Sequence, residues 1–325
     1  MRFRRLGDTG LKVSELGLGT MPFGNETDEA EAQAIVTACL DAGINLFDCA
    51  DVYNEGKAET ILGRLVAPVR DDVVIATKAG FPSAAGINRR GASPAHLRAS
   101  VEGSLTRLGT DRIDLYYLHR FDNRTGLDHT LRTLDALVAA GKILHIGVSN
   151  FAAWQVATAL GRSALRGWAP IVAIQPMYNL VKRQVEVELL PLATAADLAV
   201  FPYSPLAGGL LTGKYGTQPG AGDGRLVANE MYSLRYRDEA GYTAAADLAS
   251  IATEVGCHPA TLAVAWVGSN PAVTAPLIGG RSLDQLRPSL AAADFELDDE
   301  LRRRITALTP DPPPATDRSE EVAGG

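Results

Sequence analysis

The feature that most constrains the fold of this chain is a repeated alternation of short apolar runs with longer amphipathic segments. The apolar runs have the length and composition of β-strands and lie at 16–20, 44–48, 73–78, 113–119, 143–148, 171–175, 199–203 and 273–278. Helical patterns separate them at 28–42, 58–66, 94–108, 128–140, 151–160, 185–196, 242–255 and 283–292, with a further one at 258–268. Strands joined by helical crossovers form parallel sheets, and eight such units favour a closed (β/α)₈ TIM barrel over an open sheet.

Both ends of the chain depart from this alternation. Residues 1–16 predict a β-hairpin whose turn is Asp8-Thr-Gly10. Beyond Leu308 the chain becomes polar and is interrupted by Pro310, Pro312, Pro313 and Pro314. We therefore expect one barrel domain over residues 1–308 and a mobile tail over residues 309–325.

An open dinucleotide-binding sheet is the structural alternative. It requires G-x-G-x-x-G directly after the first strand, followed by a helix. Leu16-Gly-Leu-Gly-Thr-Met21 supplies only two of these glycines, and Pro22 stands where the helix would begin. The sequence therefore argues against this alternative.

The net charge and the cysteine content indicate which kinds of partner and which cellular compartment to expect. A formal net charge of −7 argues against nucleic acid or an anionic membrane as the main partner, because both require clustered cations. Cys39, Cys49 and Cys257 are odd in number and lack metal-ligand spacing, so we interpret them as reduced thiols. With no signal-peptide core after the basic first residues and no run long enough to span a membrane, we expect a cytoplasmic protein without a bound metal.

Four polar residues stand at the ends of three successive strand-like runs. Asp48 ends the second run, Lys78 ends the third, His119 ends the fourth, and Tyr53 follows Asp48 closely. In a (β/α)₈ barrel these ends open onto the face that holds the active site. A phenol, an ammonium, a carboxylate and an imidazole gathered there can form a proton donor with its tuning groups. Each residue also has an ordinary alternative, such as a structural Asp48–Lys78 ion pair.

The spacing of these four residues resembles the catalytic tetrad of the aldo-keto reductases. The resemblance extends from about Arg4 to Leu290 and includes the blocks at 6–14, 18–24, 146–151, 174–180 and 203–214. It implies a (β/α)₈ barrel that binds NADP(H) across its mouth without a Rossmann unit, and a small-molecule carbonyl substrate. Tyr53 would donate the proton, Lys78 would lower the pKa of Tyr53, Asp48 would hold Lys78, and His119 would orient the carbonyl oxygen.

The same resemblance implies a set of cofactor contacts. Ser149, Asn150 and Gln175 would bind the carboxamide, Tyr203 would stack on the nicotinamide, and Arg281 would bind a 2′-phosphate. The remaining expected contacts are Gly19, Thr20, Met21, Asp48, Ser204, Pro205, Leu206, Ala207, Gly208, Leu210, Lys214, Ile278, Gly279, Gly280, Gln285 and Ser289.

The chain also departs from the family pattern. Pro288 and Ser289 replace the acid and asparagine that usually contact adenine, so the departure affects the expected adenine contacts and leaves the expected phosphate contacts unchanged. Cys49 replaces the usual threonine, and Asn54-Glu-Gly-Lys57 replaces a more typical glycine-containing stretch after the tyrosine. These changes leave the four predicted catalytic residues in place, but they make the rim that faces the substrate differ from the usual family pattern.

A glycine-rich stretch at 212–240 shows no clear periodicity and includes Gly213, Gly216, Gly220, Gly222 and Gly224. We expect it to be a structureless loop at the catalytic rim, acting as a lid or disordered. It should form the pocket wall together with the apolar residues Phe23, Val52, Phe81 and Phe121. Such walls suit an aromatic, terpenoid or deoxysugar carbonyl.

Two alternatives to a reductase remain at this point. Potassium-channel β-subunits share this barrel and these motifs and act mainly as cofactor-sensing partners. A Schiff-base aldolase would instead use Lys78 as a nucleophile, but it leaves Tyr203 and Arg281 without a role. Channel-type and bacterial relatives of this family differ in oligomeric state, and the sequence predicts none.

Overall fold

The computed structural model describes residues 1–83, 86–217 and 224–316 and has the predicted barrel architecture. Its parallel strands run in the order β10-β3-β4-β5-β6-β7-β8-β9. Their bounds are β3 Gly17–Gly19, β4 Leu46–Asp48, β5 Val74–Ala79, β6 Ile113–Leu118, β7 Ile143–Ser149, β8 Ile171–Gln175, β9 Ala199–Val200 and β10 Leu277–Ile278. The amides of Thr274 and Leu277 donate to the carbonyls of Val200 and Pro202, at 2.8 Å each, and join the two edges of the sheet.

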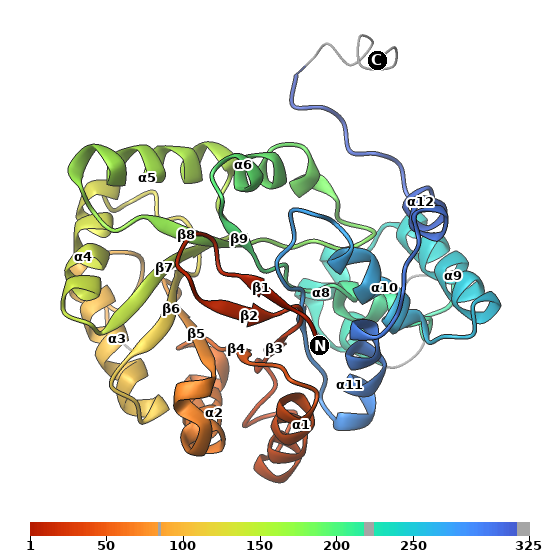
Figure 1. Ribbon diagram of the computed structural model, residues 1–325, viewed down its shortest axis with the longest axis horizontal. Helices are drawn as coiled ribbons and strands as arrows, with labels where there is room; N and C mark the ends of the chain where they lie inside the picture. Colours follow the sequence, from red (N-terminus) through yellow and green to blue (C-terminus); the bar gives the residue numbers. More distant parts are fainter. Residues whose placement is uncertain (84–85, 218–223, 317–325) are drawn as a thin grey trace.

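Helices surround this ring of strands, as Figure 1 shows. Six of them alternate with the strands up to β9 and span α1 Glu29–Asp41, α2 Lys57–Val66, α3 Pro94–Leu108, α4 Leu127–Ala139, α5 Ala153–Arg166 and α6 Leu189–Ala195. The later helices are α9 Glu239–Glu254, α10 Pro259–Gly268, α11 Leu283–Leu290 and α12 Asp299–Thr306. The main helices begin at caps visible in the sequence: Asp28 accepts from the amide of Glu31, and Ser93 with Pro94 begins α3.

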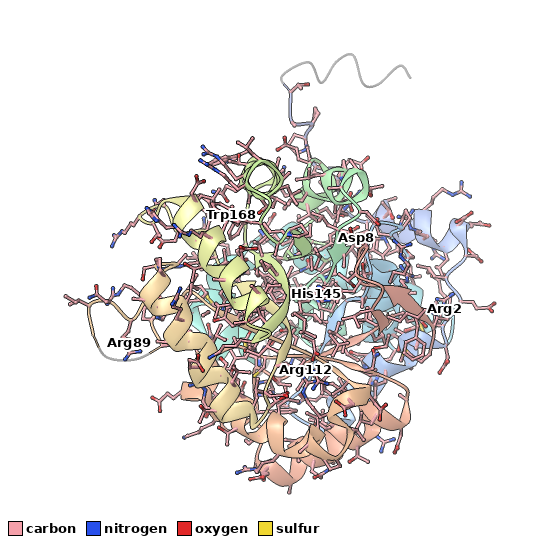
Figure 2. The ribbon with its side chains drawn as sticks, turned by 60° about the vertical axis from the view of Figure 1, so that its left-hand side comes forward. Arg2, Asp8, Arg89, Arg112, His145 and Trp168 are labelled. Carbon is pink, nitrogen blue, oxygen red and sulfur yellow. The ribbon has the colours of Figure 1, made fainter. Side chains whose placement is uncertain are left out.

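The expected hairpin is present and closes one end of the barrel. Strands β1 (Phe3–Arg5) and β2 (Lys12–Ser14) pair antiparallel and cross the centre of the ring of strands in Figure 1. Leu6 and Val13 are fully buried against side chains that fill the barrel interior. Figure 2 shows Asp8 of the hairpin turn and His145 of β7 on the same face of the molecule. The hairpin therefore leaves the opposite end, where the strands terminate, as the open end.

Two glycines permit close approaches that this packing requires. A Cβ on Gly147 of β7 would lie 2.4 Å from the ring of Tyr117 in β6, and one on Gly63 of α2 would lie 2.2 Å from the Leu108 carbonyl oxygen at the end of α3. Real side chains cannot occupy such positions, so both contacts depend on glycine. The main core lies between strands and helices and a second cluster fills the barrel interior.

The prediction of a structureless stretch at 212–240 is wrong for much of its second half. Two short helices, α7 (Arg225–Ala228) and α8 (Glu230–Arg235), lie there, and α9 already begins at Glu239. Their buried anchors are Leu226 and Tyr232. Helices of four and six residues are too short to produce a visible apolar period, which explains the error. Residues 218–223, including Gly220 and Gly222, lie outside the described residues.

The start of the predicted tail contacts the barrel. Arg183, which is mostly buried, donates to the carbonyl of Thr309 at 3.3 Å and pairs with Asp311 at 2.8 Å. No helix within the described ranges is long and apolar enough to cross a membrane. In the same ranges, His, Cys, Asp and Glu side chains form no cluster of three or more that could hold a metal ion.

Candidate active site

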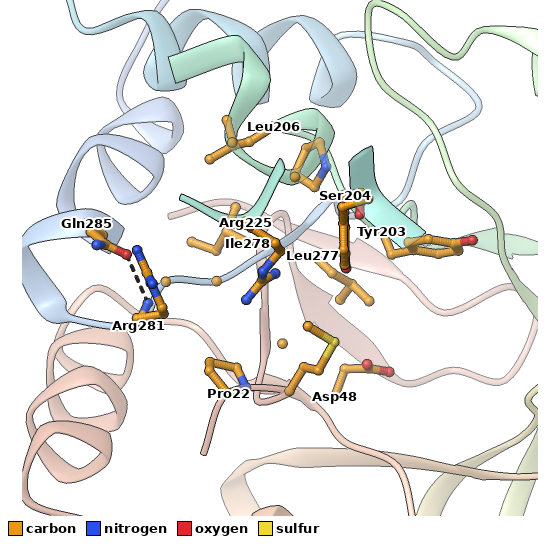
Figure 3. A pocket seen from close by; sticks show the side chains of 18 of the residues that line it. Pro22, Asp48, Tyr203, Ser204, Leu206, Arg225, Leu277, Ile278, Arg281 and Gln285 are labelled. Carbon is orange, nitrogen blue, oxygen red and sulfur yellow. Dashed lines mark hydrogen bonds between the residues drawn. The ribbon is translucent and has the colours of Figure 1, made fainter. Parts of the chain in front are cut away.

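A cavity of about 870 Å³ opens at the carboxyl ends of the strands, on the side away from the hairpin. One end contains Asp48 and Tyr203, and the other contains Arg281 and Gln285, as Figure 3 shows. We call the first the catalytic end and the second the basic end. A cavity of this size, with apolar walls and a few polar groups, is typical of a site for a small molecule or a cofactor.

Three of the four predicted catalytic residues line the catalytic end, and the fourth lies directly behind them. Asp48 is the last residue of β4, Lys78 lies near the end of β5, and His119 follows β6. Tyr53 begins a 3₁₀ turn, Tyr53–Gly56, after β4. Lys78 is fully buried and does not line the cavity. Strand ends thus place residues that are far apart in sequence around one point.

Lys78 is held by a dense set of acceptors. Its ammonium forms an ion pair with Asp48 Oδ1, donates to the Cys49 carbonyl at 2.7 Å, and lies 3.5 Å from the Tyr53 hydroxyl. The second oxygen of Asp48 accepts from Gln175 Nε2 at 2.7 Å. Burial acts to lower the pKa of Lys78, but the Asp48 carboxylate attracts the ammonium and the net pKa is raised. Lys78 is therefore a fixed cation beside the phenol.

Lys78 acts to lower the pKa of Tyr53, as expected, but burial outweighs this influence. Burial raises the pKa of Tyr53 to about 12, and the opposing influence of Lys78 is smaller. The physical reason is that a phenolate in this desolvated site loses more hydration than one ammonium, itself neutralised by Asp48, returns. Tyr53 is therefore a protonated phenol at neutral pH, with a cation placed to stabilise its anion.

His119 is a neutral imidazole at the same point. Burial, together with the positive charges of Lys78 and Arg120, lowers the pKa of His119 to about 3. Its ring lies edge-on to Tyr53, with centroids 6.0 Å apart, and packs on Phe81 at 4.7 Å. Nδ1 is buried and has no hydrogen-bond partner among the described residues. A neutral imidazole carries one N–H that can donate to an oxygen placed beside Tyr53.

The residues expected at the nicotinamide form a connected group beside the tetrad. The Tyr203 hydroxyl donates to Asn150 Oδ1 at 2.7 Å, and Asn150 Nδ2 donates to the His119 carbonyl at 2.9 Å. The Ser149 hydroxyl donates to the Gln175 carbonyl at 2.8 Å. Asn150 and Ser204 adopt positive φ angles of 57°, which non-glycine residues rarely do and which occur often at functional sites.

The cavity brings together most of the other expected cofactor residues. Those that line it are Gly19, Met21, Ser204, Pro205, Leu206, Gly208, Lys214, Ile278, Gly279, Gly280, Arg281 and Gln285. Four do not line it, and these are the buried residues Thr20, Ala207, Leu210 and Ser289. Ser289 is fully enclosed behind Pro288, which does reach the cavity and is tolerated inside α11. A role for Ser289 in binding adenine has no support from its position.

The basic end contains an arginine that the sequence reasoning missed. Arg225 of α7 lines the cavity and pairs with Glu26 at 3.0 Å, and Arg281 pairs with the other oxygen of Glu26 at 3.5 Å. Glu26 therefore bridges the loop after β3, the short helix α7 and the start of α11. The sequence feature that could have identified Arg225 was its position directly after Gly224 in the glycine-rich stretch. A basic residue in such a stretch is usually solvated, so this feature alone did not indicate a binding role.

The turn that carries Tyr53 is fastened to the cavity wall by Asn54. Asn54 has a φ of 51°, a left-handed conformation that asparagine tolerates better than most residues. Its Nδ2 donates to the carbonyls of Met21 and Phe23 at 2.9 and 2.7 Å. Asn54 thus combines a left-handed backbone conformation with two hydrogen bonds to the cavity wall.

Two of the four apolar residues predicted to form the substrate pocket line the cavity, and two do not. Val52 and Phe81 line the cavity, together with Met231 and Tyr232 of α8. Phe23 is fully buried, and Phe121 packs instead against Phe151, at 5.2 Å between centroids. Neither Phe23 nor Phe121 lines the cavity.

Comparison with known proteins agrees with this geometry. Residues 15–310 match the model of the Aldo/keto reductase family. An uncharacterized oxidoreductase, YrpG, of Bacillus subtilis (strain 168) is 38% identical and covers 96% of this chain and 97% of its own length. A probable voltage-gated potassium channel subunit beta of Oryza sativa subsp. japonica is 37% identical over 98% of this chain and 99% of that protein.

A further relative, Protein tas of Escherichia coli (strain K12), is 34% identical over 95% of this chain and 97% of its own. These relatives match almost their entire lengths, and the family match spans the barrel from β3 to beyond α12. The barrel, the hairpin and the polar residues at the strand ends fit the same assignment. The chain belongs to the aldo/keto reductase family.

Proposed function

We propose that this protein is an NADPH-dependent reductase of aldehydes or ketones in which Tyr53 delivers the proton to the carbonyl oxygen. Membership of the aldo/keto reductase family and the oxidoreductase relative support carbonyl reduction as its general chemistry. The observation that carries the specific proposal is the Tyr53 hydroxyl, 3.5 Å from a buried Lys78 ammonium and beside a neutral His119 in one cavity.

The protein groups have distinct parts in this proposal. Tyr53 holds a proton that it loses only when a stronger base, the developing alkoxide, is beside it. Lys78 stabilises the phenolate that results, and Asp48 with Gln175 keeps Lys78 in place. His119 donates a hydrogen bond to the carbonyl oxygen and orients it. NADPH, when bound, supplies the hydride.

Two features of the cavity support an extended phosphorylated dinucleotide as its ligand. Tyr203 offers an aromatic face beside the tetrad, and the glycines Gly208, Gly279 and Gly280 line the path to the basic end. Arg281 and Arg225 would meet the 2′-phosphate and its neighbouring phosphates, because guanidinium groups form charge-assisted bonds to phosphate. On cofactor binding, one of the two arginines that Glu26 joins would exchange this carboxylate for the phosphate.

The aldolase alternative is disfavoured by the surroundings of Lys78. A Schiff-base lysine must be exposed to its substrate and lose its proton. Lys78 is fully buried, ion-paired with Asp48 and has a raised pKa, so it meets neither condition.

A binding subunit is the second candidate function, because the rice relative and an Arabidopsis thaliana relative, 36% identical, are named as probable channel β-subunits. A turnover assay separates the candidates. The purified protein, given NADPH and a panel of aromatic and aliphatic aldehydes, should oxidise NADPH and form one equivalent of alcohol. Tight NADPH binding without turnover of any aldehyde would contradict the reductase and favour the binding subunit.

A further inference from the structure

The positive side chains that line the cavity are not equivalent. They are Lys214, Arg225, Arg235 and Arg281. Arg225 and Arg281 share the carboxylate of Glu26. In the part of the chain that the structure describes, no carboxylate forms an ion pair with Arg235, the last residue of α8, or with Lys214, which lies over the ring of Tyr215. A half-buried guanidinium without a counter-charge in a ligand cavity is a strong attractor for an anion.

Arg235 stacks on a buried tyrosine of its own helix. Its guanidinium lies 5.2 Å from the ring centroid of Tyr232, which also carries Arg225 at 5.2 Å. Tyr232 packs so closely on the segment after β9 that a Cβ on Gly208 would lie 2.8 Å from its ring. The neighbouring Tyr236 accepts from Asn179 Nδ2 at 3.2 Å and is likewise buried. The position of Arg235 is therefore fixed by packing and by a cation–π contact.

The charge of Arg235 acts at the catalytic end. Burial raises the pKa of Tyr203, and the largest opposing electrostatic influence on this phenol comes from Arg235, ahead of Lys78. Lys214, Arg225 and Arg281 exert no comparable influence on Tyr203. Since the Tyr203 hydroxyl binds Asn150, which in turn binds the His119 carbonyl, Arg235 faces the region beside the tetrad.

The net charge of this region is positive. Asp48 and Lys78 neutralise each other, and His119 is uncharged at neutral pH. Arg235 therefore contributes a positive charge that no neighbour cancels. The phosphates of the cofactor have their own partners, Arg225 and Arg281, at the basic end. This leaves Arg235 for an anionic group on the other ligand, the substrate.

We propose that Arg235 binds a carboxylate on the substrate, so that the preferred substrates are aldehydes or ketones that carry a carboxylate away from the carbonyl. This inference rests on the proposed reductase function. Between the carbonyl and the carboxylate the substrate meets apolar side chains, Met21, Val52, Phe81 and Met231. A planar guanidinium matches a carboxylate through two parallel hydrogen bonds, which gives direction as well as affinity. Aromatic or short aliphatic oxo acids fit this combination.

The test compares two substrates that differ only in charge, 4-formylbenzoate and its methyl ester, with saturating NADPH. The unaltered protein should prefer the acid in kcat/KM by about tenfold or more, the scale of a charged hydrogen bond. Arg235→Met should lower kcat/KM for the acid about tenfold more than for the ester and so remove this preference. Arg235→Glu should reverse the preference. Arg237→Met, at an exposed arginine outside the cavity, is the matched control and should change neither substrate.

Two results would overturn the assignment of Arg235. One is an acid-to-ester ratio that is the same in the unaltered protein and in Arg235→Met. The other is an equal loss for both substrates with weaker NADPH binding, which would make Arg235 a cofactor contact. If neither substrate is turned over, the reductase proposal fails, and the affinity for a carboxylate ligand then tests whether Arg235 binds this group. Benzoate should bind the NADPH complex more tightly than benzamide in calorimetry, and Arg235→Met should erase that difference; equal binding in the unaltered protein would contradict the proposal.

Discussion

The two ends of the cavity are built in opposite ways. At the catalytic end, β4 and β5 deliver Asp48 and Lys78, whose side chains are 5% and 0% exposed. At the basic end, a loop, a four-residue helix and a helix start deliver Glu26, Arg225 and Arg281, whose side chains are 26–40% exposed. The first group has no freedom to rearrange without disturbing the barrel. The second can exchange partners at little cost.

This difference suits the catalytic end to the chemical step and the basic end to reversible binding of the cofactor. At the catalytic end, burial shifts protonation strongly: desolvation, with a further contribution from Lys78 and Arg120, lowers the pKa of His119 to about 3. At the basic end, water and salt screen each pair, and an exposed ion pair contributes only about 0–1 kcal/mol. A site of the second kind can release its ligand readily, because Glu26 takes the place of the phosphate. Substitutions at the catalytic end and at the basic end test this contrast.

The largest effect is expected from Lys78→Met. The substitution leaves the Asp48 carboxylate buried without its partner, which should lower the free energy of unfolding by about 3–5 kcal/mol. Activity should be lost as well, because the phenolate of Tyr53 loses its stabilising cation. Urea unfolding of this variant measures the first effect. The double variant Asp48→Asn, Lys78→Met should recover stability without recovering activity; a single variant as stable as the unaltered protein would show that the pair is not effectively buried.

A smaller effect is expected at the basic end, from Arg281→Ala. Loss of a charged hydrogen bond to the 2′-phosphate should weaken NADPH binding by about 10- to 100-fold, with little change for NADH. Affinities from fluorescence titration check this, and they should fall with rising salt. Arg287→Ala, an exposed arginine on α11 outside the cavity, is the control. Equal affinities of the unaltered protein for NADPH and NADH would contradict the role of Arg281.

The pH dependence of stability should report the desolvation of the catalytic end. His119 has a pKa of about 3 in the folded protein and about 6.5 when unfolded. The unfolded state therefore binds the additional proton between these values. The stability that neutral His119 provides is complete above pH ~6.5 and is lost as pH falls toward ~3, by at most about 1.4 kcal/mol per pH unit. Urea unfolding near pH ~7.5 and ~5 should show a weaker pH dependence for His119→Gln. The same slope in both proteins would argue against a desolvated imidazole.

The smallest effect is expected from Asn54→Gly. Glycine keeps the left-handed backbone, so the loss should reflect only the two hydrogen bonds to Met21 and Phe23, about 1 kcal/mol net. Asn54→Ala should be worse than Asn54→Gly, because alanine adds left-handed strain. Unfolding free energies of the two variants provide the measurement. If alanine is the better tolerated of the two, the turn does not hold its left-handed conformation.

The same contrast explains how far the sequence could be interpreted. The barrel and the four residues at its strand ends were predictable, because the strand ends of a closed parallel barrel meet at the one face that holds the active site. The two helices of the 212–240 stretch were not, since α7 and α8 are too short for a periodic signal. Arg225 and Arg235 were missed for the same reason.

The direction of the pKa shift of Tyr53 also lay beyond the sequence. It depends on how completely the phenol is desolvated and on how far Asp48 neutralises Lys78, and both are properties of the packed site. The neutral state of His119 has the same origin. The sequence indicates which groups come together at the site. The pKa of each group depends on how burial and neighbouring charges balance, and only the packed structure determines that balance.

The most direct test of the central claim is a single-turnover measurement of hydride transfer in Tyr53→Phe. The substitution deletes one hydroxyl at the catalytic end, keeps the ring that packs there, and leaves the basic end untouched. The account predicts unchanged folding and NADPH affinity and a chemical step slowed by at least about 10²-fold. A variant that binds NADPH normally and reduces its best aldehyde at nearly the original rate would contradict Tyr53 as the proton donor.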